Sequence, residues 1–145
     1  MFLVDTNVIS ELRKGQRADS GVSRLLRGAQ QHIFLAVETI GELRQGVESL
    51  KHRGDFPQAQ MLEAWLNEVL RVFASRTLVF DLPCAEIWGA LMGPSDQNPI
   101  DKQIAAIALH YDLTVVTRNT THFQGTGVRL MNPFLADASP ARPIL

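Results

Sequence analysis

The stretch that decides the fold of this chain is FLVDTNVISEL, residues 2–12. It begins with a short apolar run, meets an acid at Asp5 and continues with apolar side chains at helical spacing. This order predicts a strand at Phe2–Val4 and a short helix over about Thr6–Arg13, with a carboxylate between them. Ligands of open α/β sheets bind outside the C-terminal ends of the strands, so Asp5 is a candidate site residue. Its alternative role is that of a helix N-cap, for which Asp is a favoured residue.

Short apolar runs and helical patterns alternate through the rest of the chain. The further strands are predicted at residues 33–35, 78–80, 114–117 and 128–131, and the further helices at 20–28, 38–50, 58–73, 83–92 and 100–111. No tight hairpin sequence joins two of the strands, which favours parallel strands connected by helices. The predicted fold class is therefore α/β, a three-layer α/β/α sandwich around a mostly parallel central sheet.

The composition indicates one globular domain. Of the 145 residues 46% are hydrophobic, and we expect a domain at residues 1–135 followed by a loose C-terminal tail at 136–145. The net charge of −1 excludes a uniformly basic nucleic-acid-binding protein but permits a local basic patch. The single cysteine, Cys84, excludes an internal disulfide and fits a reducing compartment. Because no apolar run is long enough to span a membrane or form a signal peptide, we expect a cytoplasmic protein with no membrane partner.

Two further acids lie in helical segments downstream, Glu42 and Asp101. Each has an ordinary explanation, because a lone helical glutamate is usually solvated and an acid at a helix start complements the helix dipole. If they met Asp5, the three carboxylates would repel one another unless a cation lay between them. Carboxylate oxygens in a chain with few histidines favour a hard cation, Mg²⁺ or Mn²⁺. Such an ion can lower the pKa of a bound water molecule and bind a phosphodiester oxygen, which suggests metal-assisted phosphodiester cleavage.

Four segments of the chain resemble the motifs of PIN-domain ribonucleases, in particular the toxins of VapBC-type toxin–antitoxin pairs. In order along the chain they are LVDTNVISEL (3–12), TIGELRQG (39–46), DKQIAA (101–106) and VTRN (116–119), the last followed by Phe123, and NPF (132–134) resembles the usual ending. The resemblance covers residues 2 to about 134 and implies a PIN-like fold. It also implies a Mg²⁺- or Mn²⁺-dependent endoribonuclease that cleaves RNA, forms a homodimer and has a cognate antitoxin protein as its partner.

The resemblance assigns roles to the residues that match its motifs. Asp5, Glu42 and Asp101 match the metal-binding acids of the family, and Asn119 matches a fourth position at which many members have Asp. Some members also have an acid at the position of His122, so neither place holds a fourth acid here. The number of metal ions, one or two, therefore stays open. As a histidine without a paired neighbour, His122 is more readily explained as a surface residue than as part of the site.

Hydroxyl and basic residues within the motifs are candidate substrate contacts. Thr6 and Thr117 match small hydroxyl residues that line the pocket in the family. Arg44 and Arg118 lie within motif segments, and their positions make them candidates to contact RNA phosphates. Two further basic clusters, Arg13–Arg17 and Lys51–Arg53, are explained equally well by phosphate contacts and by solubility.

Three other features have two explanations each. Glu38 lies one helical turn before Glu42, and is either an outer acid of the site or, as we favour, a charge that stabilises the helix start. Asp96 is more readily explained as a turn residue than as a ligand. The apolar stripe that includes Trp65 predicts core packing, and any exposed remainder predicts a surface for a homodimer or an antitoxin.

Two other functions compete with ribonuclease activity. Because the fourth acid is missing, the alternative is a catalytically weak PIN-like module that binds RNA or a protein, although the three retained acids argue against it. A phosphatase with a strand-end Asp nucleophile is disfavoured, since such enzymes usually carry a second Asp two residues further on, where this chain has Asn7.

Overall fold

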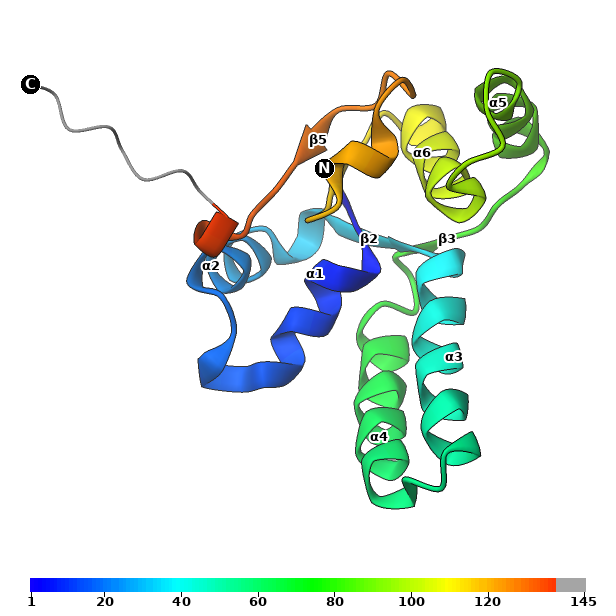
Figure 1. Ribbon diagram of the computed structural model, residues 1–145. Helices are drawn as coiled ribbons and strands as arrows, with labels where there is room; N and C mark the ends of the chain where they lie inside the picture. The colour runs from blue at the N-terminus through cyan, green and yellow to red at the C-terminus, as the bar shows by residue number, and fades with distance from the viewer. Residues whose placement is uncertain (138–145) are drawn as a thin grey trace, which may run out of the picture.

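The structure, a computed structural model, describes residues 1–137 and has five short parallel strands at its centre (Figure 1). The strands are β1 (Phe2–Val4), β2 (Ile33–Ala36), β3 (Thr77–Leu78), β4 (Thr114–Val116) and β5 (Leu130–Met131). They lie in the order β3-β2-β1-β4-β5, and every neighbouring pair is parallel, which confirms the predicted sheet. The strand order switches direction between β1 and β4. The ligand crevice of open parallel sheets lies at such a switch point.

Helices cover both faces of this sheet, as predicted for a three-layer sandwich. They are α1 (Thr6–Glu11), α2 (Ser20–Gly28), α3 (Val37–His52), α4 (Phe56–Val72), α5 (Leu82–Met92) and α6 (Pro99–Tyr111). Side chains alternate across β1, because successive strand residues point to opposite faces. Val4 therefore packs with buried residues of α1 to α4, whereas Leu3 packs with those of α5 and α6. The two hydrophobic cores hold the sheet between the two helix layers.

Helices α3 and α4 form a hairpin that extends away from the sheet (Figure 1). α3 starts directly after β2, and α4 begins where the carboxylate of Asp55 accepts a hydrogen bond from Gln58 N and caps the helix. Trp65 of α4 is half-buried and packs against the hydrophobic core, which confirms its predicted packing role. On the outer side of the hairpin, Arg44 Nη1 and Glu63 Oε1 are 2.6 Å apart and link the two helices.

The first helix is shorter than predicted. α1 ends at Glu11, and the chain continues as a 3-10 helix at Leu12–Arg17. Gly15 within it has a φ of +59°, a left-handed conformation that is strained for residues with a side chain. The helical path therefore breaks at Gly15, as the sequence indicated, but its last turns tighten before the break. The edge strands β3 and β5 are also shorter than predicted, since each has one neighbouring strand to pair with.

The C-terminal segment is bound to the domain as far as the structure describes it. A 3-10 turn, Leu135–Asp137, lies beside α2 (Figure 1). The backbone N–H groups of its first two residues each donate to the carboxylate of Asp19, at 3.1 Å. The first two residues of the tail expected at 136–145 thus contact the domain, and residues 138–145 lie outside the described part. Within residues 1–137, no helix combines the length and hydropathy of a membrane span.

Candidate functional site

Asp5 lies at the C-terminal end of β1, in the middle of the sheet, and is 4% exposed. Its carboxylate accepts hydrogen bonds from Thr6 N at 2.9 Å, Thr117 Oγ1 at 2.8 Å and Asn7 Nδ2 at 3.3 Å. The bond from Thr6 caps α1, so the capping role is confirmed. Burial raises the pKa of Asp5 above its ordinary value, the bonds from Thr117 and Thr6 oppose this rise, and the negative charge of Asp101 adds to it.

Thr117 and Asn7 connect the ends of β1 and β4. Thr117 directly follows β4, is fully buried, and accepts hydrogen bonds at Oγ1 from Asn7 Nδ2 at 3.2 Å and from Asn119 N at 3.0 Å. Asn7 Oδ1 in turn accepts a bond from Arg118 N at 3.0 Å. Side chains from two neighbouring strand ends therefore hold the carboxylate of Asp5. The sequence reasoning overlooked Asn7, although an amide two residues after a strand-end acid lies within reach of that acid.

Glu42 reaches the same region from α3. Its Oε1 accepts a hydrogen bond from Thr6 Oγ1 at 2.8 Å. Partial removal of this carboxyl group from water raises its pKa, the hydrogen bond from Thr6 lowers it, and the negative charges of Asp5 and Asp101 raise it further. The carboxyl groups are thus close enough to disfavour one another's ionisation, as expected of one acidic cluster.

Asp101 lies in the first turn of α6 and pairs with His122, which follows β4 in a 3-10 turn at Thr120–Phe123. The distance from His122 Nδ1 to Asp101 Oδ2 is 3.0 Å, and both side chains are partly exposed. The preferred surface explanation for His122 was therefore incomplete, because its ring also forms one wall of the acidic region. The available signal was its place directly before Phe123, where some proteins with this motif carry an acid.

These side chains surround one pocket of about 370 Å³. It is lined by Asp5, Thr6, Asn7, Glu42, Asp101, Asn119 and His122. Carboxylate and amide oxygens of this kind are chemically suited to a hard cation. Among residues 1–137, however, no three His, Cys, Asp or Glu side chains are grouped as metal ligands, and each of the three carboxylates has its own hydrogen-bond partner. A cation shared by the three acids would require their carboxylates to come closer together.

Arg44 does not line this pocket. Its guanidinium lies between α3 and α4, where it pairs with Glu63 at 2.6 Å and with Glu48 at 3.7 Å. Residues two positions apart on a helix point in directions about 200° apart, so Arg44 faces away from Glu42. The structure therefore does not place Arg44 at this pocket, and its contact with RNA phosphate stays a prediction.

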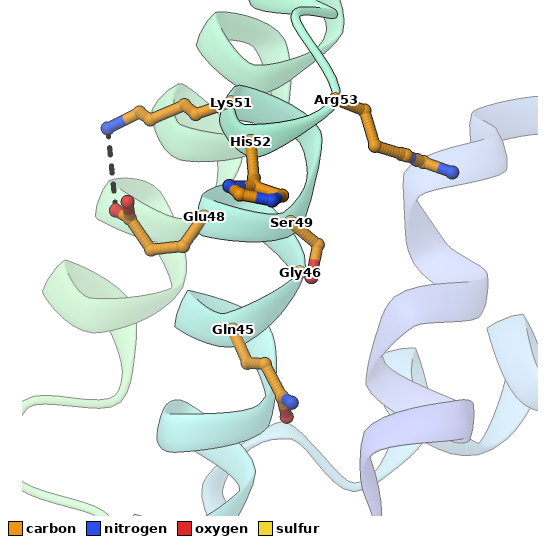
Figure 2. A pocket seen from close by; sticks show the side chains of 7 residues that line it. All are labelled: Gln45, Gly46, Glu48, Ser49, Lys51, His52 and Arg53. Carbon is orange, nitrogen blue, oxygen red and sulfur yellow. Dashed lines mark hydrogen bonds and ion pairs between the residues drawn. The ribbon is translucent and has the colours of Figure 1, made fainter.

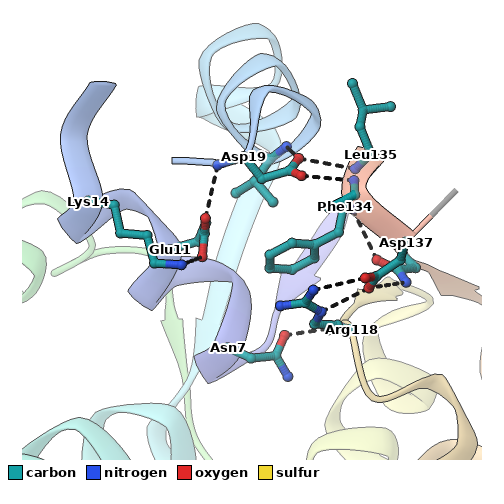
Figure 3. A network of polar contacts seen from close by, with 11 residues as sticks. Asn7, Glu11, Lys14, Asp19, Arg118, Phe134, Leu135 and Asp137 are labelled. Atoms are coloured by element: carbon teal, nitrogen blue, oxygen red, sulfur yellow. Dashed lines mark hydrogen bonds and ion pairs between the residues drawn. The ribbon is translucent and has the colours of Figure 1, made fainter. Parts of the chain in front are cut away.

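Arg118 also turns away from the pocket, toward the C-terminal segment (Figure 3). Its guanidinium donates two hydrogen bonds to Asp137, both 2.8 Å long, and its Cζ lies 4.4 Å from the centroid of the Phe134 ring. The pairing raises the pKa of Arg118 and lowers that of Asp137. Toward the site, Arg118 contributes the backbone N–H that bonds to Asn7. Arg118 thus forms an internal ion pair in this structure, and its contact with RNA phosphate stays a prediction.

Glu38 and Asp96, the two acids for which a role outside the site was favoured, also lie outside the pocket. Glu38 is in the first turn of α3, where burial raises its pKa and its Oε2 has no hydrogen-bond partner among the described residues. Asp96 is exposed in the loop before α6. Thr6 lines the pocket, and Thr117 lies buried beneath it. The structure therefore brings together the three principal acids and both hydroxyl residues, without Arg44, Arg118, Glu38 or Asp96.

Known proteins of similar sequence have matching length. The sequence profile of the PIN domain matches residues 2–127. Plasmid stability protein StbB of Pseudomonas syringae pv. tomato is 33% identical, over 94% of this chain and 100% of that protein. Toxin FitB of Neisseria gonorrhoeae is 34% identical, over 92% of this chain and 99% of that protein. VapC ribonuclease Y4jK of Sinorhizobium fredii is 32% identical, over 92% of this chain and 98% of that protein.

Solved structures share the arrangement of helices and strands. The crystal structure of FitAcB from Neisseria gonorrhoeae has a TM-score of 0.79 at 33% identity, and the match covers 92% of this chain and 98% of that one. The structure of FitAB bound to an IR36 DNA fragment has a TM-score of 0.77 at 31% identity, over 92% and 95% of the two chains. The profile match and these relatives extend over most of the sequence. The chain therefore belongs to the PIN domain family.

Proposed function

We propose that this protein is a metal-dependent endoribonuclease and the toxin of a type II toxin–antitoxin pair. The observation that carries the proposal is the pocket at the C-terminal edge of the sheet, where Asp5, Glu42 and Asp101 meet from β1, α3 and α6. The names of its relatives support the same reading, since they include a VapC ribonuclease and toxin FitB.

The residues of the pocket have distinct tasks in this reaction. Asp5, Glu42 and Asp101 would hold Mg²⁺ or Mn²⁺, which when bound would lower the pKa of a water molecule for attack on the RNA phosphodiester. Thr117 keeps the carboxylate of Asp5 at the sheet edge through its 2.8 Å hydrogen bond, so this ligand is oriented before RNA binds. His122 holds the carboxylate of Asp101 at the opposite wall.

We expect RNA, an antitoxin and a second copy of the chain as partners. FitAB complexes among the related structures support an antitoxin. For a protein partner, α4 offers exposed apolar side chains, since Phe56 is 60% and Met61 72% exposed. Exposed apolar side chains of this kind could contribute to a protein interaction surface if they form one contiguous patch.

The second candidate function is a catalytically weak module that binds RNA or protein. Two observations favour it: Asn119 occupies the pocket at the position where a fourth acid is common, and the carboxylates of the described residues are not grouped as ligands. A metal titration separates the candidates. RNA that binds but stays intact across the whole range of Mg²⁺ and Mn²⁺ concentrations would support the weak module.

Asp5→Asn tests the nuclease directly. The substitution removes one ligand charge but keeps a side-chain oxygen that can cap α1, so we expect a folded protein whose Mg²⁺-dependent RNA cleavage falls by at least about 100-fold. Asp81→Asn is the matched control, because Asp81 caps α5 by accepting a bond from Cys84 N and lies outside the pocket. Gel-based cleavage of labelled RNA, with circular dichroism to confirm folding, gives the readout. Full activity in Asp5→Asn would refute the metal assignment.

A further inference from the structure

A larger hollow, about 970 Å³, lies along the exposed side of α3, outside the acidic pocket (Figure 2). The side chains that line it include Gln45, Glu48, Ser49, Lys51, His52 and Arg53. All of them are polar or charged, and no large apolar side chain is present. The proposed nuclease mechanism uses none of these residues, so the hollow requires its own explanation.

Helical geometry connects this hollow to the acidic pocket. From Glu42, steps of three, four and four residues lead to Gln45, Ser49 and Arg53, and residues at such spacings share one face of a helix. The rise of 1.5 Å per residue places Arg53 roughly 16 Å from Glu42 along the axis. The face therefore runs as one line from the acidic pocket to the tip of the α3–α4 hairpin.

The basic residues that line this hollow differ in whether a nearby acid balances their charge. Lys51 Nζ lies 3.4 Å from Glu48 Oε1 and 3.6 Å from Glu63 Oε2, so its charge is largely balanced. Arg53 and His52 form no ion pair within residues 1–137. Figure 2 shows Lys51 turned toward Glu48, whereas Arg53 extends in the opposite direction. A free cation therefore lies at the far end of the face, beyond the neutral donors Gln45 and Ser49.

We infer that this face of α3 is a binding track for the RNA strand on one side of the cleavage point. The inference rests on the proposed ribonuclease function. Backbone phosphates are contacted by arginine and by neutral side-chain donors, and both kinds of group lie along this face of α3. A length of roughly 16 Å accommodates about five nucleotides if their bases stay stacked at about 3.4 Å each, as in one strand of a duplex, and fewer if the strand is extended. The core of a protein–protein interface is instead enriched in aromatic and apolar side chains, which this hollow lacks.

The test measures RNA binding by the full chain in an Asp5→Asn background, so that the RNA stays intact. Arg53→Gln removes the free cation, and Gln45→Glu adds a negative charge next to the pocket without changing the size of the side chain. The matched controls make the same changes on α4 at exposed positions outside the hollow, Arg71→Gln and Gln60→Glu. The probes are fluorescently labelled single-stranded RNAs of about two and about ten nucleotides, shorter and longer than the track.

We expect both track variants to bind the longer RNA roughly 5- to 10-fold more weakly than the controls do. The loss should be smaller for the short RNA, which cannot reach Arg53. Loss of one phosphate contact should also make the slope of log affinity against log salt less steep by about 0.7 for Arg53→Gln. Affinities equal to those of the controls for both RNAs would overturn the track.

Cleavage by the unsubstituted protein is scored separately, so that the two proposals can fail independently. If it cleaves RNA while the track variants bind like the controls, the nuclease stands and the track falls. If the unsubstituted protein does not cleave RNA but the track variants lose affinity, RNA binding by this face stands, whereas the nuclease and its cleavage point fall. Sedimentation of Gln45→Glu completes the test, because dissociation of a dimer without loss of RNA binding would make this face an interface between copies and overturn the track.

Discussion

At the scale of single residues, the acids of the pocket are held where their ionisation is unfavourable. Asp5 is buried at the C-terminal end of the central strand β1, and Glu42 lies close enough for the charge of Asp5 to raise its pKa. Both pKa values are raised, in each case chiefly by loss of contact with water. The hydrogen bonds from Thr117 and Thr6 offset part of this cost. Carboxyl groups with raised pKa values gathered in one pocket are typical of functional sites, which supports the function proposed for this pocket.

We predict that Glu42→Gln stabilises the metal-free protein at neutral pH. Because the pKa of Glu42 is raised by folding, the folded state holds this proton more tightly than the unfolded state does. That contribution is fully present below the ordinary value of 4.5 and is lost as the pH rises through the folded value. Gln keeps the acceptor for Thr6 without the charge, so the gain in the free energy of unfolding should shrink as the pH falls from above the folded value toward 4.5, and should be lost below 4.5.

Urea unfolding at several pH values measures this gain. Glu86→Gln is the matched control, since Glu86 is an exposed helical glutamate on α5 outside the pocket. The same pH profile in both variants would show that Glu42 carries no unfavourable charge in the folded state.

At the scale of elements, α2 and the C-terminal segment pack closely because Gly21 has no side chain. A Cβ atom on Gly21 would lie 2.1 Å from the carbonyl oxygen of Pro133 and 2.9 Å from Leu135 Cγ. Near Gly28, at the other end of the same helix, no atom lies within 4 Å of such a Cβ. The close approach brings the N–H groups of the C-terminal turn to the carboxylate of Asp19 (Figure 3). Gly21 is therefore a packing requirement of the two elements.

This contact predicts opposite effects for two identical substitutions. Gly21→Ala should lower the free energy of unfolding by about 1–3 kcal/mol, because the backbone at Pro133 would have to shift. Gly28→Ala should cause no loss and can add up to about 1 kcal/mol through the higher helix propensity of alanine. Denaturant unfolding of both variants gives the comparison. A Gly21→Ala protein as stable as Gly28→Ala would mean that the C-terminal segment does not pack against α2 in solution.

At the scale of the whole molecule, the pocket joins elements that pack on opposite faces of the sheet. Glu42 comes from α3 in one helix layer, Asp101 from α6 in the other, and Asp5 from the strand between them. A cation held by all three would cross-link the layers. Its binding free energy would then add to the stability of the fold, because the unfolded chain cannot gather these ligands.

We therefore predict that Mn²⁺ raises the melting temperature. Mass action gives about 2.7 kcal/mol of added stability when the ion is present at about 100 times its dissociation constant. Thermal melts with and without Mn²⁺, at matched ionic strength, measure the shift. Asp5→Asn should lose most of it and Asp81→Asn should retain it. The absence of any shift in the unsubstituted protein would argue against a shared site for the three acids.

The amino-acid sequence by itself determined the type and order of the elements. The strand Phe2–Val4 and the helix Ser20–Gly28 have the predicted bounds, and the parallel order of the strands followed from the helices between them. The position of Asp5 at the end of a strand was also predictable, because three apolar residues precede it and a helical pattern follows it. These features depend on side-chain periodicity and capping, which involve residues within about four positions of one another.

Which side chains meet was decided by the tertiary structure. Thr117 bonds to Asp5 from 112 positions away, and His122 pairs with Asp101 from 21 positions away. Arg118 directly precedes the pocket residue Asn119 along the chain. Its side chain nevertheless turns to Asp137, which lies in a segment expected to be loose. A long side chain has several directions of nearly equal local energy, so the choice among them depends on where the packing of distant elements places a partner of opposite charge. Local sequence patterns carry no information about that placement.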